Sequence, residues 1–158
     1  MEKEKPNYRP TGILAREANR VAGTKIILKY HEPAEARKPA PKSGWRLFVF
    51  KGAEAMEGIQ LWERSCWLIG RERAVADILA EHPSVSGQHA VLQFRYRGEG
   101  GVRPYIMDLE SAHGTFLNGE RCEGGRYVEL REGDVLRFGG SEREYVVMVP
   151  PKEGEKEE

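Results

Sequence analysis

From residue 45 onward the chain is a succession of short apolar runs separated by turn residues, and this pattern limits the folds open to it. Along the longest run, Ala90, Leu92 and Phe94 alternate with Gln93 and Arg95, which is the two-residue period of a strand. Short strands at regular spacing, with no convincing helix between them, predict an all-β sandwich. The runs of strand-like composition cover residues 45–50, 65–70, 76–79, 88–96, 104–109, 114–117, 126–130, 134–138 and 144–149.

One connection between these runs carries a specific turn signal. Asn118-Gly119 follows Thr-Phe-Leu and precedes Glu-Arg-Cys. This dipeptide suits a two-residue hairpin turn in which both central residues take positive φ. We therefore expect an antiparallel hairpin centred on these two residues.

The first 44 residues differ from the rest of the chain. They contain five of the nine prolines and no sustained apolar period, although residues 23–30 could form one strand. Residues 31–44 have the composition of an extended linker. The sequence therefore predicts an extended partner-binding arm and linker over residues 1–44, largely disordered when alone, a β domain over residues 45–150 and a charged tail over residues 151–158.

A net charge of zero conceals an uneven charge distribution. Residues 1–50 carry eleven Lys/Arg against five Asp/Glu, whereas residues 51–150 carry twelve against sixteen. A basic arm on an acidic domain suggests an anionic partner for the arm, although a solvated tail has the same composition. No apolar run approaches the length of a membrane span, so no membrane partner is expected.

The two cysteines argue against a metal site. Cys66 and Cys122 stand alone, with no CxxC or Cys/His ligand spacing around either. Isolated cysteines fit a reducing compartment, where they behave as small apolar residues. We expect an intracellular protein without cofactors or metals.

Four polar clusters lie at the edges of the predicted strands, at residues 70–71, 86–89, 108–111 and 114–119. They combine arginine, serine and glycine-turn residues. An arginine fork matches phosphate oxygens, a serine adds a hydroxyl donor, and glycines let backbone N–H groups approach. Such loops suit the capture of a phosphate on another protein rather than the breaking of a bond.

The order of these clusters resembles a known family. Gly-Arg after a strand, then Ser-x-x-His, then Ser-x-x-Gly-Thr-x-x-Asn-Gly make residues 67–149 similar to a forkhead-associated (FHA) domain. The resemblance implies a β-sandwich of about eleven strands that binds phosphothreonine peptides at loops on one end. The phosphopeptide-binding residues expected from the resemblance and the loop chemistry are Arg71, Ser86, Gly87, Ala112, His113 and Thr115. The residues expected to support the loops are Gly70, His89, Gly114, Asn118 and Gly119.

One position departs from the family pattern. FHA domains usually carry Asn before Gly-Thr, and its side chain binds the peptide backbone next to the phosphothreonine. Here the residue is His113. A histidine offers one bond per nitrogen and does not copy the paired geometry of an amide. The affinity and sequence selectivity for phosphopeptides are therefore expected to differ.

The arm narrows the resemblance further. The stretches 8–20, 28–39 and 45–47 are similar to the group of Smad nuclear-interacting protein, which includes the fungal pre-mRNA leakage protein and the plant DAWDLE protein. That similarity implies a nuclear subunit of the spliceosome-associated pre-mRNA retention and splicing (RES) complex, docked through its N-terminal arm on an RRM-containing subunit. Because the arm cannot form its own core, we expect it to fold on binding, through Tyr8, Ile13, Leu14 and Val21.

A phosphothreonine-peptide-binding adaptor has two alternatives. An enzyme is disfavoured because no acid is evident to orient His89 beside Ser86, and no nucleophile-elbow or P-loop motif occurs. The alternative that stays open is a phosphate-independent scaffold whose basic arm contacts pre-mRNA weakly within a complex. The arm has few aromatic residues, Tyr8 and Tyr30, and no RRM signature, so sequence-specific RNA recognition is not expected.

Overall fold

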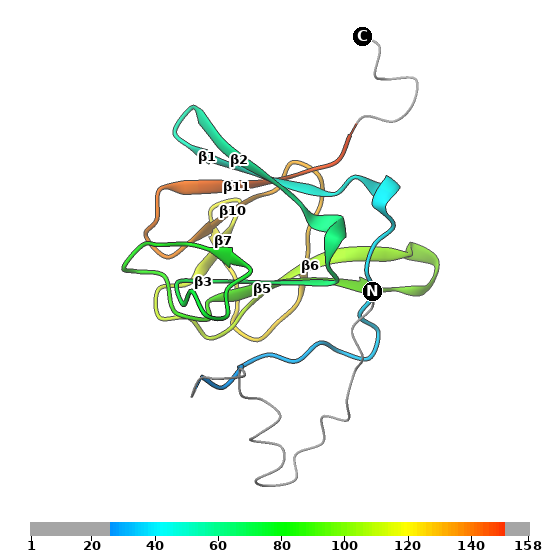
Figure 1. Cartoon of the computed structure of the whole chain (residues 1–158), viewed down its shortest axis with the longest axis horizontal. Helices are drawn as coiled ribbons and strands as arrows, with labels where there is room; N and C mark the ends of the chain where they lie inside the picture. The colour runs from blue at the N-terminus through cyan, green and yellow to red at the C-terminus, as the bar shows by residue number, and fades with distance from the viewer. Residues whose placement is uncertain (1–25, 151–158) are drawn as a thin grey trace, which may run out of the picture.

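The computed structural model describes residues 26–150, which form two β-sheets packed face to face (Figure 1). One sheet has six strands in the order β2-β1-β11-β10-β7-β8, and the other has five in the order β4-β3-β5-β6-β9. The strands are β1 (Arg46–Lys51), β2 (Glu54–Gln60), β3 (Cys66–Gly70), β4 (Ile78–Leu79), β5 (Ala90–Tyr96), β6 (Val102–Asp108), β7 (Thr115–Leu117), β8 (Glu120–Arg121), β9 (Val128–Glu129), β10 (Val135–Phe138) and β11 (Arg143–Met148). The predicted all-β sandwich is confirmed.

The only helical segments in this part of the chain are short 3₁₀ turns. They are η1 (Pro41–Ser43), η2 (Leu61–Glu63) and η3 (Gly98–Gly100). Within residues 26–150, therefore, no helix is long and apolar enough to cross a membrane.

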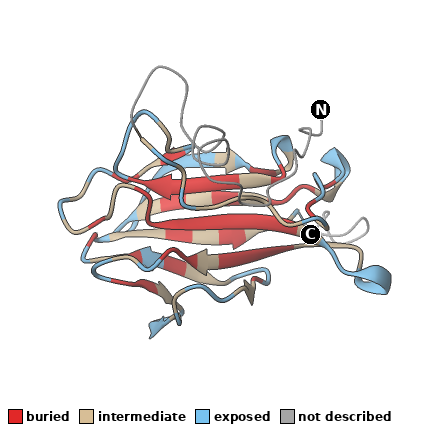
Figure 2. Cartoon of the chain, turned by 90° about the horizontal axis from the view of Figure 1, so that it is seen from below, coloured by how far each residue is buried: buried red, intermediate tan, exposed pale blue. Residues whose placement is uncertain are grey.

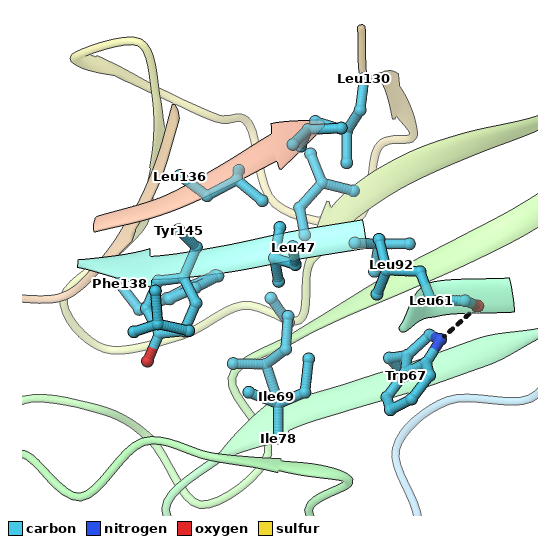
Figure 3. Close-up of a cluster of buried hydrophobic side chains, with 14 of the residues drawn as sticks. Leu47, Leu61, Trp67, Ile69, Ile78, Leu92, Leu130, Leu136, Phe138 and Tyr145 are labelled. Carbon is cyan, nitrogen blue, oxygen red and sulfur yellow. Dashed lines mark hydrogen bonds between the residues drawn. The ribbon is translucent and has the colours of Figure 1, made fainter. Parts of the chain in front are cut away.

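The core lies between the two sheets and is built from alternate residues of their strands (Figure 3). Leu47, Leu92 and Leu136 have no exposed surface. Fully burying side chains of this size stabilises the fold by about 1.5–3 kcal/mol each. Trp67 closes one end of the core and donates its indole N–H to the carbonyl oxygen of Leu61 at 3.1 Å. The buried positions run along the central strands in Figure 2.

The strand prediction holds for the buried strands and fails for the exposed strand β2. Each of the nine predicted runs contains an observed strand, but β2 was not expected, and β8 was expected only as the second arm of the predicted hairpin. Six of the seven residues of β2 are exposed, so its side chains carry no alternating apolar signal. The expected hairpin connects β7 to β8, with φ of 52° at Asn118 and 87° at Gly119.

Residues 26–40, which we call the strap, lie along the outer face of the five-stranded sheet (Figure 1). The hydroxyl of Tyr30 donates to Oε1 of Gln93 at 2.7 Å, and Nε2 of Gln93 donates to a carboxylate oxygen of Glu32 at 3.0 Å. Glu35 forms an ion pair with Arg95. The strap therefore covers the polar residues of β5 that alternate with its core-facing residues.

The strap bears on where the domain begins. Residue 45 was predicted as the boundary, and the first strand does begin at Arg46. However, Ala36 in the strap is only 1% exposed, and the amide of Arg37 donates to the carbonyl of Phe94 at 3.2 Å. These contacts favour an earlier boundary, which stays a prediction. The predicted arm residues Tyr8, Ile13, Leu14 and Val21 and the tail 151–158 lie outside the described residues.

Candidate functional site

Two loops run side by side at one end of the sandwich because Gly70 lets them approach. The amide of Arg71 donates to the carbonyl of Ser86 at 3.0 Å, and the amide of Glu72 donates to the carbonyl of Gly87 at 3.1 Å. A Cβ on Gly70 would overlap the carbonyl oxygen of Gly87 and lie 2.8 Å from its carbon. Only glycine fits at residue 70 without displacing the facing loop.

Arg71 presents the end of its guanidinium to solvent. Its Nε donates to the carbonyl of Val85 at 2.8 Å, which fixes the plane of the group. The two terminal nitrogens have no hydrogen-bond or ion-pair partner among residues 26–150. An anchored guanidinium with two free N–H-bearing nitrogens is arranged for bidentate contact with phosphate oxygens.

Ser86 connects this loop pair to a third loop. Its Oγ accepts the amide proton of Ala112 at 3.1 Å, which leaves its own hydroxyl proton available. In the described part of the chain, the amides of Gly87 and His113 donate no hydrogen bond, and His113 is exposed. These residues place one hydroxyl and two backbone donors on the loops beside Arg71. That donor set suits an anion.

His89 lies behind the loops and has no exposed surface. Its Nδ1 accepts the amide proton of Ser86 at 3.0 Å, so the proton of a neutral ring is on Nε2, which donates to the carbonyl of Gly114 at 2.9 Å. Burial lowers the pKa of His89, although the Gly114 carbonyl opposes that effect. The neutral ring thus connects two loops.

His89 and Ser86 do not form a nucleophile and base. The imidazole binds the amide of Ser86 rather than its hydroxyl, so it is not placed to take the hydroxyl proton. Asp108 lies 4.0 Å from Nε2 of His89, but that nitrogen is bonded to a carbonyl. The three residue types of a hydrolytic triad are present without its geometry.

Asp108 organises the third loop and was not among the predicted site residues. Its carboxylate accepts hydrogen bonds from the amide and hydroxyl of Ser111 at 3.0 and 2.6 Å, and from the hydroxyl of Thr115 at 2.7 Å. Burial alone would raise the pKa of Asp108, but these hydrogen bonds outweigh it and hold the pKa below its ordinary value. The Asp-x-x-Ser spacing was visible in the sequence as a local turn signal.

Thr115 was predicted to contact the phosphopeptide, but the structure places its side chain inside the sandwich. Its side chain is 0% exposed, and its hydroxyl points to Asp108. Thr115 is the first residue of β7, and alternation along that strand turns it towards the core. We therefore correct its role from ligand contact to loop support.

The predicted supporting residues occupy two different places. Gly114 has φ of 88°, and its carbonyl accepts from both His89 and the amide of Gly139. It lies directly in the junction of the loops. Asn118 and Gly119 form the hairpin at the far end of β7. They fix the register of that strand and do not touch the loop cluster.

The strap also reaches this end of the sandwich, which the sequence did not predict. The side-chain amide of Gln88 accepts from the backbone of Lys29 at 2.9 Å and donates to the carbonyl of Ile27 at 3.0 Å. Nζ of Lys29 lies 3.4 Å from the carbonyl oxygens of Gln88 and Leu109. These partners are 59 to 80 residues apart in the sequence, so no local pattern reveals them.

No metal or redox chemistry is evident in the described region. Residues 26–150 contain no group of three or more His, Cys, Asp or Glu side chains that could hold a metal ion. Cys66 and Cys122 form no disulfide, and burial raises the pKa of Cys122. A thiol with a raised pKa is a poor nucleophile at neutral pH.

Comparisons with known proteins support the fold and point to one family. The FHA domain model matches residues 67–139. Smad nuclear-interacting protein 1 of Mus musculus is 47% identical over 154 residues, which cover 92% of this chain and 39% of that protein. FHA domain-containing protein DDL of Arabidopsis thaliana is also 47% identical, over 93% of this chain and 48% of its own length. The chain thus spans less than half the length of these two relatives.

A solved structure extends the comparison. It is described as the structure of the yeast Pml1 splicing factor and its integration into the RES complex. It is 34% identical to this chain, covers 77% of this chain and 97% of its own, and superimposes with a TM-score of 0.68. The predicted resemblance is confirmed, and the chain belongs to the FHA-domain family of Smad nuclear-interacting protein 1, DDL and Pml1.

Proposed function

We propose that this chain is a non-enzymatic adaptor that binds phosphothreonine peptides at the loops around Arg71 and Ser86. FHA domains bind phosphothreonine peptides. The observation that carries the proposal here is the anchored Arg71, whose terminal nitrogens are unpaired in the described region beside the Ser86 hydroxyl. The amides of Gly87 and His113 complete a donor set on the same loops.

The proposal gives the methyl group of phosphothreonine a role. Serine and threonine phosphopeptides differ by this one group. If the methyl is removed from water in the complex, threonine gains about 0.8 kcal/mol, which is about fourfold in affinity.

The test is a phosphothreonine-peptide library probed with the full chain and with Arg71→Ala. Loss of a charge-assisted pair of hydrogen bonds weakens binding by about 10- to 100-fold. Arg71→Lys should restore only part of that loss, because an ammonium lacks the planar fork. Arg73→Ala is the matched control, since Arg73 is exposed and already paired with Glu81. Equal binding of phosphorylated and unphosphorylated peptides would instead support a phosphate-independent scaffold.

His113 sets the expected difference from other FHA domains. Its side chain is exposed on the third loop, next to the free amide of its own backbone. His113→Asn restores the amide that the family uses on the peptide backbone, so we expect tighter binding of phosphopeptides. Unchanged affinity would mean that this position does not touch the ligand.

We further propose that the protein acts in the nucleus as a subunit of the RES complex, docked through its arm on an RRM-containing subunit. The relatives support this, because one is named for nuclear interaction and another is described as a splicing factor in the RES complex. Calorimetry with the RRM subunit tests the docking. Deleting residues 1–25, which leaves the strap in place, should abolish binding, and unchanged affinity would rule out the arm as the contact.

A further inference from the structure

Three arginines stack on aromatic rings at the end of the sandwich opposite the loops around Arg71 and Ser86. A guanidinium within about 6 Å of a ring centroid is attracted by the electrons of the ring face. Measured from Cζ to the ring centroid, the stacks are Arg46 over Trp62 at 5.3 Å, Arg103 over Trp45 at 5.6 Å and Arg37 over Tyr96 at 5.9 Å. Planar cationic groups and planar aromatic groups are thus concentrated on one surface of the domain.

The three stacks are neighbours, although they come from distant parts of the chain. The carbonyl of Trp45 accepts the amide proton of Leu61, the residue before Trp62, at 3.0 Å. The ring of Trp45 lies 6.3 Å from that of Phe94, and Tyr96 follows Phe94 on the same face of β5. η1 packs against η2, and Figure 1 shows both turns at the end of the sandwich where β5 ends. We call this surface the basic end, and it is formed by residues 37–46, 61–64 and 95–103.

Two of these rings lie outside the core. Leu92 and Phe94 share a face of β5 with Tyr96 and have no exposed surface, whereas Tyr96 is 49% exposed. Trp62 is half-buried and does not belong to the core between the sheets. An aromatic ring that faces water is stabilised when another planar group stacks on it. The basic end therefore offers ring faces to a ligand.

The basic end also carries positive charge that the domain does not neutralise. Within residues 26–150, five of its basic side chains form no ion pair with a carboxylate, and the acids on the same surface are Glu63 and Glu99. The side-chain hydrogen bonds of Arg37 and Arg46 go to backbone carbonyls, which leave the charge in place. The five basic side chains are Arg37, Lys38, Lys42, Arg46 and Arg97. Such an excess of positive charge attracts a polyanion.

We propose that the basic end binds single-stranded nucleic acid. The phosphates contact the five basic side chains, and the bases stack on the exposed faces of Trp62, Tyr96 and the arginine guanidinium groups. An acidic peptide matches the charge but leaves the ring faces unused, and a duplex hides the faces of its bases. The inference goes beyond the proposed function, because it adds a second site at the other end of the sandwich. It also places nucleic acid on the folded domain, whereas the sequence suggested only the arm.

Fluorescence anisotropy with the full chain measures the binding of four probes that are matched in charge. The probes are oligouridylate, oligothymidylate, an RNA duplex and polyglutamate. We expect the two single strands to bind at least about fivefold more tightly than the duplex or polyglutamate at equal salt. Comparing oligouridylate with oligothymidylate shows whether the ribose 2′-hydroxyl adds affinity. Lys42→Gln and Arg97→Gln should each reduce the slope of log K against log salt by about 0.7.

Matched variants locate the bound strand. Tyr96→Leu and Trp62→Leu keep an apolar side chain but remove the ring, so each should weaken oligouridylate binding by about fivefold or more. Tyr96→Phe and Trp62→Phe keep a ring and should lose less. Because Tyr96 is exposed, its variants should leave Tm nearly unchanged. Lys51→Gln is the control for the charge variants, because Lys51 is exposed at the opposite end of β1 from Arg46.

The outcomes separate this inference from the proposed function. Unchanged affinity in Tyr96→Leu, Trp62→Leu and Arg97→Gln would assign the nucleic acid to the arm and overturn the inference. Equal binding of polyglutamate or of the duplex would also overturn it, because neither uses the ring faces. So would displacement of oligouridylate by a phosphothreonine peptide, since both ligands would then share the loops around Arg71. If the wild type binds oligouridylate as expected but no phosphopeptide, the proposed function fails and this inference stands.

Discussion

Replacing Gly70 by alanine should damage both the fold and the site, whereas the same change at Gly87, in the facing loop, should not. A Cβ on Gly70 would overlap backbone atoms of Gly87, and no rotamer change can relieve a clash with backbone. A Cβ on Gly87 would lie 3.5 Å from Cβ of Glu72, which is ordinary contact distance. The two glycines face each other, so they make a matched pair.

The expected loss of stability follows from the backbone hydrogen bonds that the added Cβ would disrupt. To admit the Cβ, the loops must separate, and this disrupts the bonds from the amides of Arg71 and Glu72, now 3.0 and 3.1 Å long. Two backbone hydrogen bonds contribute about 2 kcal/mol, and residual overpacking adds about 1–3 kcal/mol. Alanine also restricts the unfolded chain more than glycine does, which offsets about 0.4–1 kcal/mol of this loss. The free energy of unfolding should therefore fall by about 3 kcal/mol, and Tm by about 10–15 °C.

Urea unfolding followed by tryptophan fluorescence measures the free energy, and calorimetry measures Tm. Gly87→Ala should stay within about 0.5 kcal/mol of the wild type. Phosphopeptide affinity should also fall in Gly70→Ala, because the displaced loop carries Ser86. Equal unfolding midpoints for the two variants would refute the rigid approach of these loops.

Three further predictions concern Thr115, the strap and pH. Thr115→Val should lower the free energy of unfolding by about 1–3 kcal/mol, because Asp108 loses a hydrogen-bond donor. Thr115→Ser keeps the hydroxyl and should lower it by less. Equal losses for the two variants in urea unfolding would contradict this. A chain beginning at residue 45 should melt below one beginning at residue 26, because buried Gln93 loses Glu32 and Tyr30; coincident transitions would restore the boundary at 45. Since the pKa of His89 lies below its ordinary 6.5, the unfolded chain binds more protons as pH falls through that value. The free energy of unfolding should therefore fall as the pH is lowered from about 7.5 to 5.5. The same fall should occur in a His31→Gln variant, which removes the other histidine whose pKa is lowered. Equal or higher stability at the lower pH would contradict this account.

The sequence predicted those strands whose side chains alternate between core and solvent. Leu92 and Leu136 lie in such runs and are fully buried in the structure. It could not predict β2, because a strand exposed at nearly every position has no apolar period. It placed Gln93 on the face opposite Leu92, but it gave no sign that the strap would cover that face.

The loop clusters of the site could be predicted because glycine and short polar residues mark turns locally. The direction of each side chain could not. Thr115 stands beside the third loop in sequence, but the pleat of β7 turns it to Asp108. Lys29 and Gln88 come together only because the strap crosses the sheet, across about sixty residues of chain. The exact start of β7 decided the first case, and tertiary packing, which no local pattern encodes, decided the second.

The measurement that tests the central claim most directly is an NMR titration of the isotope-labelled full chain with a phosphothreonine peptide from the library and with its unphosphorylated form. The free amides of Gly87 and His113 are the reporters, because neither donates a hydrogen bond within residues 26–150. We predict that the phosphorylated peptide shifts both amide protons downfield and binds at least about tenfold more tightly than the unphosphorylated one. Equal affinities, or shifts confined to residues away from these loops, would contradict the account.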